Sequence, residues 1–185
     1  MRKQMYGIGL IALMLSFLLL FPFLGTFLSN SSVHVTSENH EISPFFLQNE
    51  QAPVVFAYFG YVGCARTCTP SLQEIASLYD VFKTVEPKTK VYFVNLNPDQ
   101  PENLPDLFAK GFHRDFNGVY ASQKQIDTMA RIYNLSITSN GGEMGHTSAL
   151  FMFVKRPLGY VLKNIYTTHP YSLKHILTDM QKALR

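Results

Sequence analysis

Apolar and polar positions divide the chain into a long apolar segment, a short polar stretch, and a region where apolar residues recur with the periods of strands and helices. The apolar segment runs from Met5 to Leu28, and no Asp, Glu, Lys or Arg occurs between Gln4 and Ser37. A helix rises about 1.5 Å per residue, so this segment is long enough to cross a hydrocarbon core about 30 Å thick. Residues 1–28 are therefore predicted to form one N-terminal transmembrane helix.

The residues on either side of this segment predict its orientation. Arg2 and Lys3 precede it, and the positive-inside tendency places such a terminus in the cytoplasm. Residues 29–41 are rich in Ser, Asn and Thr and are expected to form a linker. Residues 42–185 are then a domain on the periplasmic side of the inner membrane. A cleaved signal peptide is the alternative, and Gly25 to Ser29 is a poor cleavage site for it.

After the linker, nearly continuous apolar runs indicate buried strands, and apolar residues at helical spacing indicate amphipathic helices. The predicted strands are 53–60, 90–96, a short one around Val119, 147–154 and 160–166. Four helices are predicted. The first begins with Thr69 as a cap or with Ser71 in a capping box, and the second passes through Leu104. The third begins at Ser122, and the fourth begins at Tyr171 or Ser172. The order is strand, helix, strand, helix, strand, helix, hairpin, helix. This order predicts an α/β fold, a thioredoxin-like mixed sheet with helices on both faces.

Composition narrows the classes of function. Lys and Arg number 16 against 13 Asp and Glu, for a formal net charge of +3, and Arg2 and Lys3 supply two of these charges. About one positive charge remains for the rest of the chain, which does not support binding to nucleic acid. The chain has two cysteines. Two are too few for a multi-disulfide scaffold or a four-cysteine metal site, so a metal ion needs at least one ligand other than sulfur.

Cys64 and Cys68 form a C-x-x-x-C motif between the first predicted strand and the first predicted helix. In a helical turn this spacing puts the two Cβ atoms about 5 to 6 Å apart, close enough for one metal ion or, after a modest adjustment, a disulfide. The helix N-terminus, the cation of Arg66 and the second thiol are each expected to lower the thiol pKa, and the thiolate is both the nucleophile and the soft metal ligand. A structural disulfide is the alternative, although one that closes so short a loop adds little stability.

A metal ion held by two thiolates needs a further ligand, and His146 is the best candidate among the six histidines. It stands in a glycine-rich loop, 141–147, which runs into an apolar strand and is expected at the same end of the sheet as the cysteines. A capping or hydrogen-bonded histidine is the alternative. Weaker candidates are His113, in a polar turn, and the thioether of Met144. The remaining histidines are expected in the linker or facing solvent: His34, His40, His169 and His175.

Three segments of the chain resemble the Sco/SenC family of membrane-tethered, thioredoxin-fold proteins. They are the strand with the C-x-x-x-C motif at 55–68, the segment 95–116 that contains Asn97-Pro98-Asp99, and the segment 145–151. The resemblance implies that Cys64, Cys68 and His146 bind copper, as Cu(I), Cu(II) or both. It also implies a role in assembling the copper centre of cytochrome c oxidase, with the copper-site subunit of that enzyme or another copper or thiol protein as the client.

The chain departs from the family pattern beside the cysteines. Ala65 and Thr69 stand where the family usually has Pro, Arg66 stands where an acidic residue is common, and Asn97 replaces an Asp. These changes keep the predicted ligands but alter their electrostatics. Arg66 would oppose a divalent cation and would stabilise the net negative complex of Cu(I) with two thiolates.

The same cysteines support a second hypothesis, an extracytoplasmic thiol-disulfide oxidoreductase that acts on cysteines of a partner. One thiolate of the Cys64 and Cys68 pair would attack a disulfide of the partner, and the other would resolve the mixed disulfide. The two activities are compatible, since a metal chaperone must often keep the thiols of its target reduced. A peroxidase and a non-catalytic interaction domain with a structural disulfide are the weaker alternatives.

Overall fold

The computed structural model describes residues 14, 16, 17, 43–140 and 143–185. The strands are β1 (Val54–Gly60), β2 (Lys90–Asn95), β3 (Phe116–Tyr120), β4 (Ile137–Asn140), β5 (Glu143–His146), β6 (Leu150–Arg156) and β7 (Gly159–Tyr166). The helices are the 3-10 turn η1 (Phe45–Leu47), α2 (Cys68–Val85), α3 (Leu104–Lys110), α4 (Gln123–Tyr133) and α5 (Leu173–Ala183). The predicted order of elements is confirmed, and η1 and the β4–β5 hairpin are additions to it.

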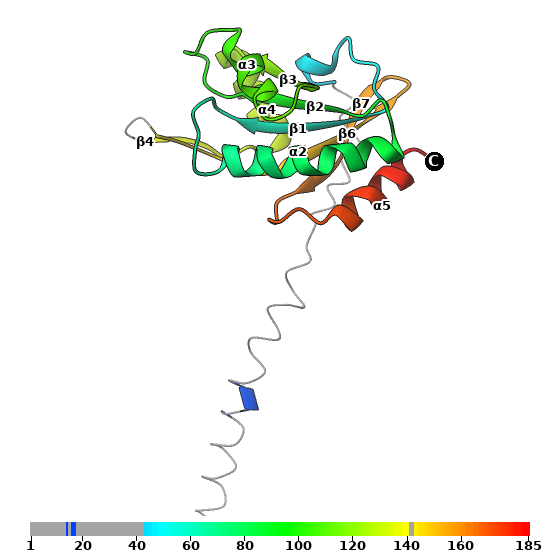
Figure 1. Cartoon of the computed structure of the whole chain (residues 1–185). Helices are drawn as coiled ribbons and strands as arrows, with labels where there is room; N and C mark the ends of the chain where they lie inside the picture. Colours follow the sequence, from blue (N-terminus) through cyan, green and yellow to red (C-terminus); the bar gives the residue numbers. More distant parts are fainter. Residues whose placement is uncertain (1–13, 15, 18–42, 141–142) are drawn as a thin grey trace, which may run out of the picture. The chain divides into compact units, whose positions relative to one another are not determined.

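β1 lies at the centre of a five-stranded sheet with the order β3-β2-β1-β6-β7 (Figure 1). All seven residues of β1 are buried, as its nearly continuous apolar sequence predicts. β1 runs parallel to β2, with Gly60 opposite Asn95, and antiparallel to β6, with Tyr58 opposite Leu150. β3 is parallel to β2, and β7 is antiparallel to β6. The fold is therefore the mixed, thioredoxin-like α/β sheet that the sequence predicts.

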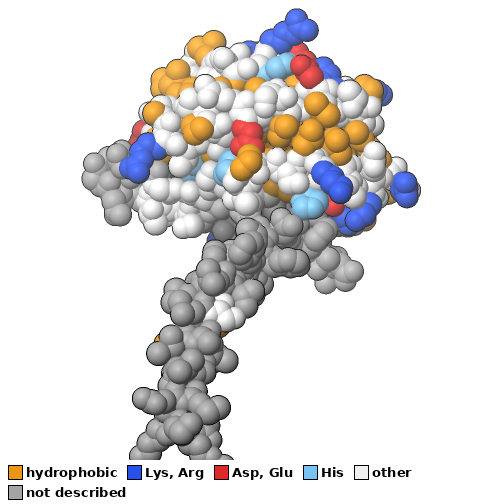
Figure 2. Space-filling view, turned by 60° about the horizontal axis from the view of Figure 1, so that its bottom comes forward, with side chains coloured by type: hydrophobic (Ala, Val, Ile, Leu, Met, Phe, Trp, Pro, Cys, Tyr) orange, Lys and Arg blue, Asp and Glu red, His pale blue; other side chains and the backbone are white. Residues whose placement is uncertain are grey.

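Alternate residues of β1 face two separate hydrophobic cores. Tyr58 belongs to the core that α2 and α5 cover, whereas Phe59 belongs to the core that α4 and η1 cover. Figure 1 shows α2 and α5 together on the same side of the sheet. Figure 2 shows the lower side of the domain, where apolar side chains reach the surface near the middle and Lys and Arg lie toward the margins. Cys64 and Cys68 both belong to the core under α2 and α5.

Helix α2 begins earlier than its sequence predicts. Its first residue is Cys68, with Thr67 at the N-cap position, so neither Thr69 nor Ser71 caps it. The backbone N–H and the hydroxyl of Thr69 both donate to the carbonyl oxygen of Cys64, at 3.2 Å each. These bonds close a turn over the C-x-x-x-C motif, and the helix starts inside the motif for that reason. Ser71 is buried instead of marking the start of the helix.

His146 is the last residue of a strand, where the sequence predicts a loop. β5 pairs antiparallel with β4 in a separate two-stranded sheet, with Ile137 opposite His146 (Figure 1). The base of this hairpin is fixed by Ser136 and Thr147, because Thr147 N–H donates to Ser136 O at 3.0 Å and Ser136 N–H donates to Thr147 Oγ1 at 2.9 Å. The apolar strand that follows, β6, consequently begins at Leu150 rather than at residue 147.

Other predicted boundaries are close to the observed ones. Ser122 is the N-cap residue of α4, and its N–H donates to the side chain of Gln125 at 2.8 Å. Ser172 is the N-cap residue of α5. In the part of the chain that the structure describes, no helix combines the length and the apolar character needed to cross a membrane. The predicted transmembrane helix and linker, 1–41, lie outside the described residues apart from three helical positions at 14, 16 and 17.

Candidate metal centre

The cysteine loop leaves the central strand at Gly60 and enters α2 at Cys68. A Cβ atom on Gly60 would lie 2.7 Å from Cys68 Sγ, so glycine allows the sulfur to pack against the end of the strand. Gly63 has a φ of +92°, a conformation that favours glycine. Cys64 is 5% exposed and Cys68 is 0% exposed, and neither forms a disulfide in this structure. The loop therefore presents two buried thiols at the end of the central strand.

Side chains from the end of β2 hold this loop in place. Asn95 is wholly buried; its Oδ1 accepts from Val62 N–H at 3.3 Å, and its Nδ2 donates to Asn97 O at 2.8 Å. Gln100 Nε2 donates to Val62 O at 2.9 Å. Neither Asn95 nor Gln100 was expected at the site. The sequence signals for them were a polar residue at the end of an otherwise apolar strand and their place in the segment 95–116.

The structure brings His146 to the two cysteines across a long separation in sequence. His146 Nε2 lies 3.1 Å from Cys68 Sγ and 3.8 Å from Cys64 Sγ. All three possible ligand atoms lie within 4.8 Å of one another. His146 is half-buried, and the rings of Tyr58 and Tyr61 meet its ring edge to face at centroid distances of 6.2 and 5.8 Å. The imidazole is thus confined with Nε2 directed at the sulfurs.

The hydrogen bond between His146 and Thr147 determines which ring nitrogen of His146 carries the hydrogen and which can bind a metal ion. Nδ1 lies 3.2 Å from the carbonyl oxygen of Thr147, and a carbonyl oxygen can only accept, so Nδ1 carries the hydrogen. In the neutral ring, Nε2 then has an unshared electron pair facing both sulfurs. A backbone carbonyl in this role commonly orients a histidine that binds a metal.

The two thiols have opposite pKa shifts. Burial alone would raise the pKa of the Cys64 thiol, but hydrogen bonds from the Thr67 hydroxyl and from the Cys68 thiol and N–H lower this pKa to about 6. Burial raises the pKa of Cys68 to about 12, and the adjacent Cys64 sulfur adds to the effect. Arg66 is exposed and is not among the groups that lower the Cys64 pKa. The expected acidification is therefore wrong for Cys68. At Cys64 the expected contributions of the second thiol and of an N–H at the start of α2 are confirmed, Thr67 adds to them, and Arg66 does not contribute.

The other candidate side chains lie elsewhere. His113 is half-buried and lies apart from the cysteines: it packs on Tyr79 and Phe116, and its Nδ1 accepts from Asp115 N–H at 3.1 Å. His169 is exposed, as expected, with Nδ1 2.9 Å from Glu74 Oε2. His175 is also exposed. His34 and His40 lie outside the described residues, as does the side chain of Met144.

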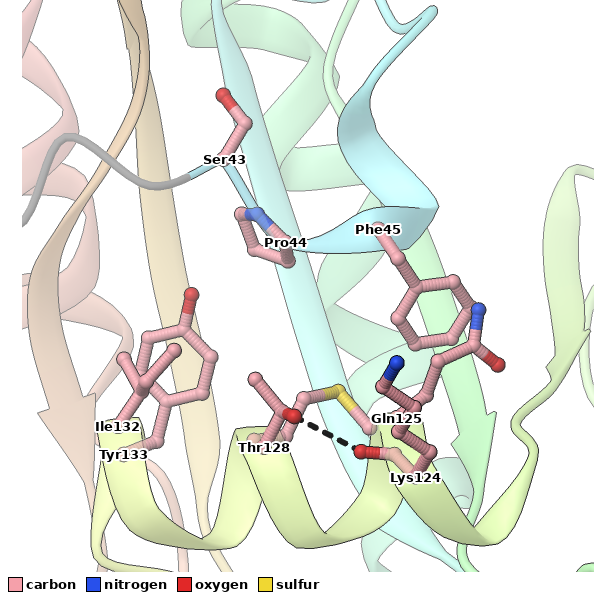
Figure 3. Close-up of a pocket in the computed structure, with 9 residues that line it drawn as sticks. Ser43, Pro44, Phe45, Lys124, Gln125, Thr128, Ile132 and Tyr133 are labelled. Atoms are coloured by element: carbon pink, nitrogen blue, oxygen red, sulfur yellow. Dashed lines mark hydrogen bonds between the residues drawn. The ribbon is translucent and has the colours of Figure 1, made fainter.

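A separate cavity of about 160 Å³ lies between η1 and α4. Figure 3 shows Pro44 and Phe45 on one side of it and Thr128, Ile132 and Tyr133 rising from α4 on the other. Tyr133 belongs to the core on the opposite face of the sheet from the cysteines. The residues that line this cavity include no Cys or His, so it is not a candidate metal centre.

The donor set at Cys64, Cys68 and His146 fits one soft metal ion. In zinc sites, thiolate sulfur and imidazole nitrogen bind at about 2.3 and 2.0 Å, so donors that share an ion lie within about 4 Å of one another. The distances from His146 Nε2 to the two sulfurs, 3.1 and 3.8 Å, fall in this range. Thiolates select soft ions such as Cu(I) and Zn(II), and imidazole suits copper and zinc. The same pair of thiols can also exchange with a disulfide of another protein.

The family model described as SCO1/SenC matches residues 39–183. No match was found among curated proteins. The solved structure of apo Sco1 from Thermus thermophilus is 25% identical, with a TM-score of 0.58, and the match covers 71% of this chain and 80% of that one.

Two further solved structures share the fold at lower identity. ScoI of Arabidopsis thaliana with copper bound is 18% identical with a TM-score of 0.62, and the match covers 73% of this chain and 86% of that one. BsSco, described as a member of the Sco family of cytochrome c oxidase assembly proteins with a disulfide switch, is 18% identical with a TM-score of 0.53. That match covers 70% of this chain and 79% of BsSco.

Proposed function

This chain belongs to the SCO1/SenC family, and we propose that it binds copper through Cys64, Cys68 and His146 and passes it to a client protein. One observation carries the proposal: the three possible ligand atoms, two from the C-x-x-x-C motif and one from β5, lie within 4.8 Å of one another. The copper-bound ScoI of Arabidopsis thaliana, which has the same fold, supports the choice of metal.

The residues of the site are suited to hold Cu(I) as cargo. Cys64, with its pKa of about 6, is a thiolate at neutral pH and supplies the first soft donor. The unshared pair of His146 Nε2 is available without loss of a proton, because Nδ1 is the protonated nitrogen. Cys68 must lose its proton as the ion binds, since thiols bind metals as thiolates. Imidazole also accommodates Cu(II).

The client and the location are part of the same proposal. BsSco is described as belonging to a family of cytochrome c oxidase assembly proteins, which supports the copper-site subunit of that oxidase as the client, with another copper or thiol protein as the alternative. Residues 1–28 would anchor the chain in the inner membrane, 29–41 would form the linker, and 42–185 would be the periplasmic thioredoxin-like domain. The apolar run from Met5 to Leu28 supports this arrangement.

The test is a Cu(I) competition titration of the reduced full-length protein in detergent, against a chromogenic chelator and without oxygen. We expect one tightly bound equivalent. His146→Ala should weaken binding about 100-fold, because even the loss of a partner that orients a ligand costs 10- to 100-fold. His175→Ala, which removes an exposed imidazole, is the matched control and should leave the affinity unchanged. Equal affinities for the two variants would exclude His146 from the site.

A second candidate function is thiol-disulfide exchange, and the opposite pKa shifts of the two cysteines favour it. Cys64, with the lowered pKa, would attack a disulfide of the client and form a mixed disulfide, releasing one client thiolate. Cys68 would then lose its proton and displace the second client thiolate. The client ends as a dithiol, and Cys64 and Cys68 end as a disulfide. The disulfide switch ascribed to BsSco supports this chemistry as a companion of copper binding.

A further inference from the structure

Three hydroxyl groups meet beside the candidate metal centre. The hydroxyl of Tyr58 lies 3.1 Å from Ser148 Oγ, and Ser71 Oγ lies 3.5 Å from the same Ser148 Oγ. Ser71 Oγ is also 3.5 Å from Nε2 of His169, whose Nδ1 lies 2.9 Å from Glu74 Oε2. Tyr58, Ser71 and Ser148 are called the hydroxyl cluster below. Neither the sequence motifs nor the proposed ligand set accounts for it.

Each member of the hydroxyl cluster belongs to a different segment that carries a proposed ligand. Tyr58 is on β1, which leads into the loop with Cys64. Ser71 is on α2, one turn after Cys68. Ser148 follows His146 by two residues, in the connection from β5 to β6. The cluster therefore joins the three ligand-bearing segments at one point.

His146 depends on such a connection more than the cysteines do. The cysteine segments continue directly from β1 of the central sheet into α2, whereas β5 pairs with β4 in a separate two-stranded sheet. The position of His146 relative to the sulfurs is thus set by the base of this hairpin and by the residues between β5 and β6. Ser148 is the residue of that connection whose side chain bonds to β1 and α2.

The burial of Tyr58 indicates that its hydroxyl has a specific task. The residue is 0% exposed, and the ring lies edge to face with His146 at 6.2 Å. Phe56, two residues earlier on the same face of β1, is also wholly buried, so an aromatic ring without a hydroxyl packs in this core. A buried hydroxyl without a partner is costly, and Ser148 is the partner that removes this cost.

We propose that the hydroxyl cluster positions the imidazole of His146 against the two sulfurs, so that Tyr58, Ser71 and Ser148 are positioning residues for metal binding. The inference rests on the proposed copper site. The three side chains are not among the proposed ligands. They act through His146, whose distance from Cys68 Sγ, 3.1 Å, is held by the bond between Tyr58 and Ser148.

The test combines hydroxyl deletions with the ligand deletion. Tyr58→Phe and Ser148→Ala should each weaken Cu(I) binding of the full-length protein about tenfold, as loss of an orienting hydrogen bond does. Tyr79→Phe is the matched control, because it removes another buried tyrosine hydroxyl, bonded to Thr89 O at 3.0 Å, far from the site. It should leave the copper affinity unchanged. Ser148→Thr keeps the hydroxyl and should retain most of the affinity.

The decisive comparison is made in the His146→Ala background. If the cluster acts through His146, Tyr58→Phe adds no further loss of affinity once the imidazole is gone. An equal tenfold loss in that background would overturn the inference, because the hydroxyl would then act on the cysteines or on the fold as a whole. Unchanged affinity for both Tyr58→Phe and Ser148→Ala in the wild-type background would overturn it as well.

A metal-free measurement separates this inference from the copper proposal. In the reduced protein without copper, Ser148→Ala should speed amide hydrogen exchange at Thr147, whose N–H bonds to Ser136 O, whereas Tyr79→Phe should not. If His146→Ala leaves copper affinity unchanged, the proposed ligand set fails and the role in metal binding fails with it, whereas faster exchange at Thr147 still supports the cluster as what holds the His146 segment in place. Exchange at the wild-type rate overturns the positioning role whatever the copper titration gives.

Discussion

At the scale of single residues, the site depends on Gly60 as much as on the cysteines. A Cβ atom there would lie 2.7 Å from Cys68 Sγ and 3.1 Å from a ring carbon of Phe93. Gly60→Ala should therefore displace the sulfur, weaken Cu(I) binding and lower the free energy of unfolding by about 1–3 kcal/mol, as overpacking does. Urea unfolding and the copper titration measure the two effects.

Gly63→Ala is the control for this substitution. Its Cβ atom meets no other atom within 4 Å, although the φ of +92° makes the change unfavourable for the backbone. It should cost stability without displacing the Cys68 sulfur. If Gly60→Ala and Gly63→Ala weaken copper binding equally, the close approach of Gly60 to the sulfur has no special role.

The reactivity of Cys64 gives a second prediction at this scale. Its pKa of about 6 lies below the ordinary value of 9.0, so the fraction of thiolate rises through pH 6 and is nearly complete at pH 7.5. The rate of iodoacetamide alkylation at Cys64 in the reduced, metal-free protein should follow this curve. Mass spectrometry of the peptides should show little modification of Cys68 over the same range. A midpoint near pH 9 for Cys64 would contradict the assigned hydrogen bonds.

The sequence identified the residues with distinctive chemistry but not those that support them. The spacing of Cys64 and Cys68 and the place of His146 before an apolar strand made His146 the best candidate for a third ligand, and the resemblance to the Sco/SenC family implied the full set. The hydroxyl cluster consists of common residue types, Tyr58, Ser71 and Ser148, and its role depends on contacts between residues that are far apart in the sequence. Tyr58 and Ser148, for example, are 90 residues apart. Such contacts leave no local pattern. The contribution of Thr67 to the lowered Cys64 pKa was missed, and that of Arg66 was wrongly expected, because the sequence does not show which side chain bonds to the sulfur.

At the scale of elements, the carboxyl end of β2 supports the cysteine loop through Asn95. Asn95→Ala would leave Val62 N–H and Asn97 O without their partner, and should lower the free energy of unfolding by about 1–3 kcal/mol. Asn117→Ala on β3 is the matched control, because its longer bonds, of 3.4 Å, lie in a half-buried place and should cost less. Urea unfolding gives both values. Equal losses in the free energy of unfolding would mean that Asn95 supports the cysteine loop no more than Asn117 does.

The elements also show where sequence patterns reach their limit. The buried strands and the helices after Ser122 and Ser172 were predictable, because the spacing of apolar residues and the capping residues can be seen within the segment itself. The β4–β5 hairpin was not, since its strands have four residues each and pair only with each other. The start of α2 was misplaced because the turn over the C-x-x-x-C motif depends on bonds from Thr69 to Cys64.

At the scale of the whole molecule, the proposal joins a soft-metal site to a membrane anchor. Expressed in a bacterium, the full-length chain should sediment with membranes and remain there after a high-salt wash, because an apolar segment such as Met5 to Leu28 is held by lipid rather than by charge. A variant that lacks residues 1–28 should be absent from the membrane fraction. Release of the full-length chain by salt, or recovery of a chain shortened near residue 28, would contradict an uncleaved anchor.

The central claim is that one copper ion is shared by two sulfurs and one imidazole nitrogen. X-ray absorption at the copper edge of the Cu(I)-loaded full-length protein tests it most directly. We expect two sulfur neighbours at about 2.3 Å and one nitrogen at about 2.0 Å, with the nitrogen lost in His146→Ala. A spectrum with sulfur neighbours alone, or one that His146→Ala does not change, would contradict the claim.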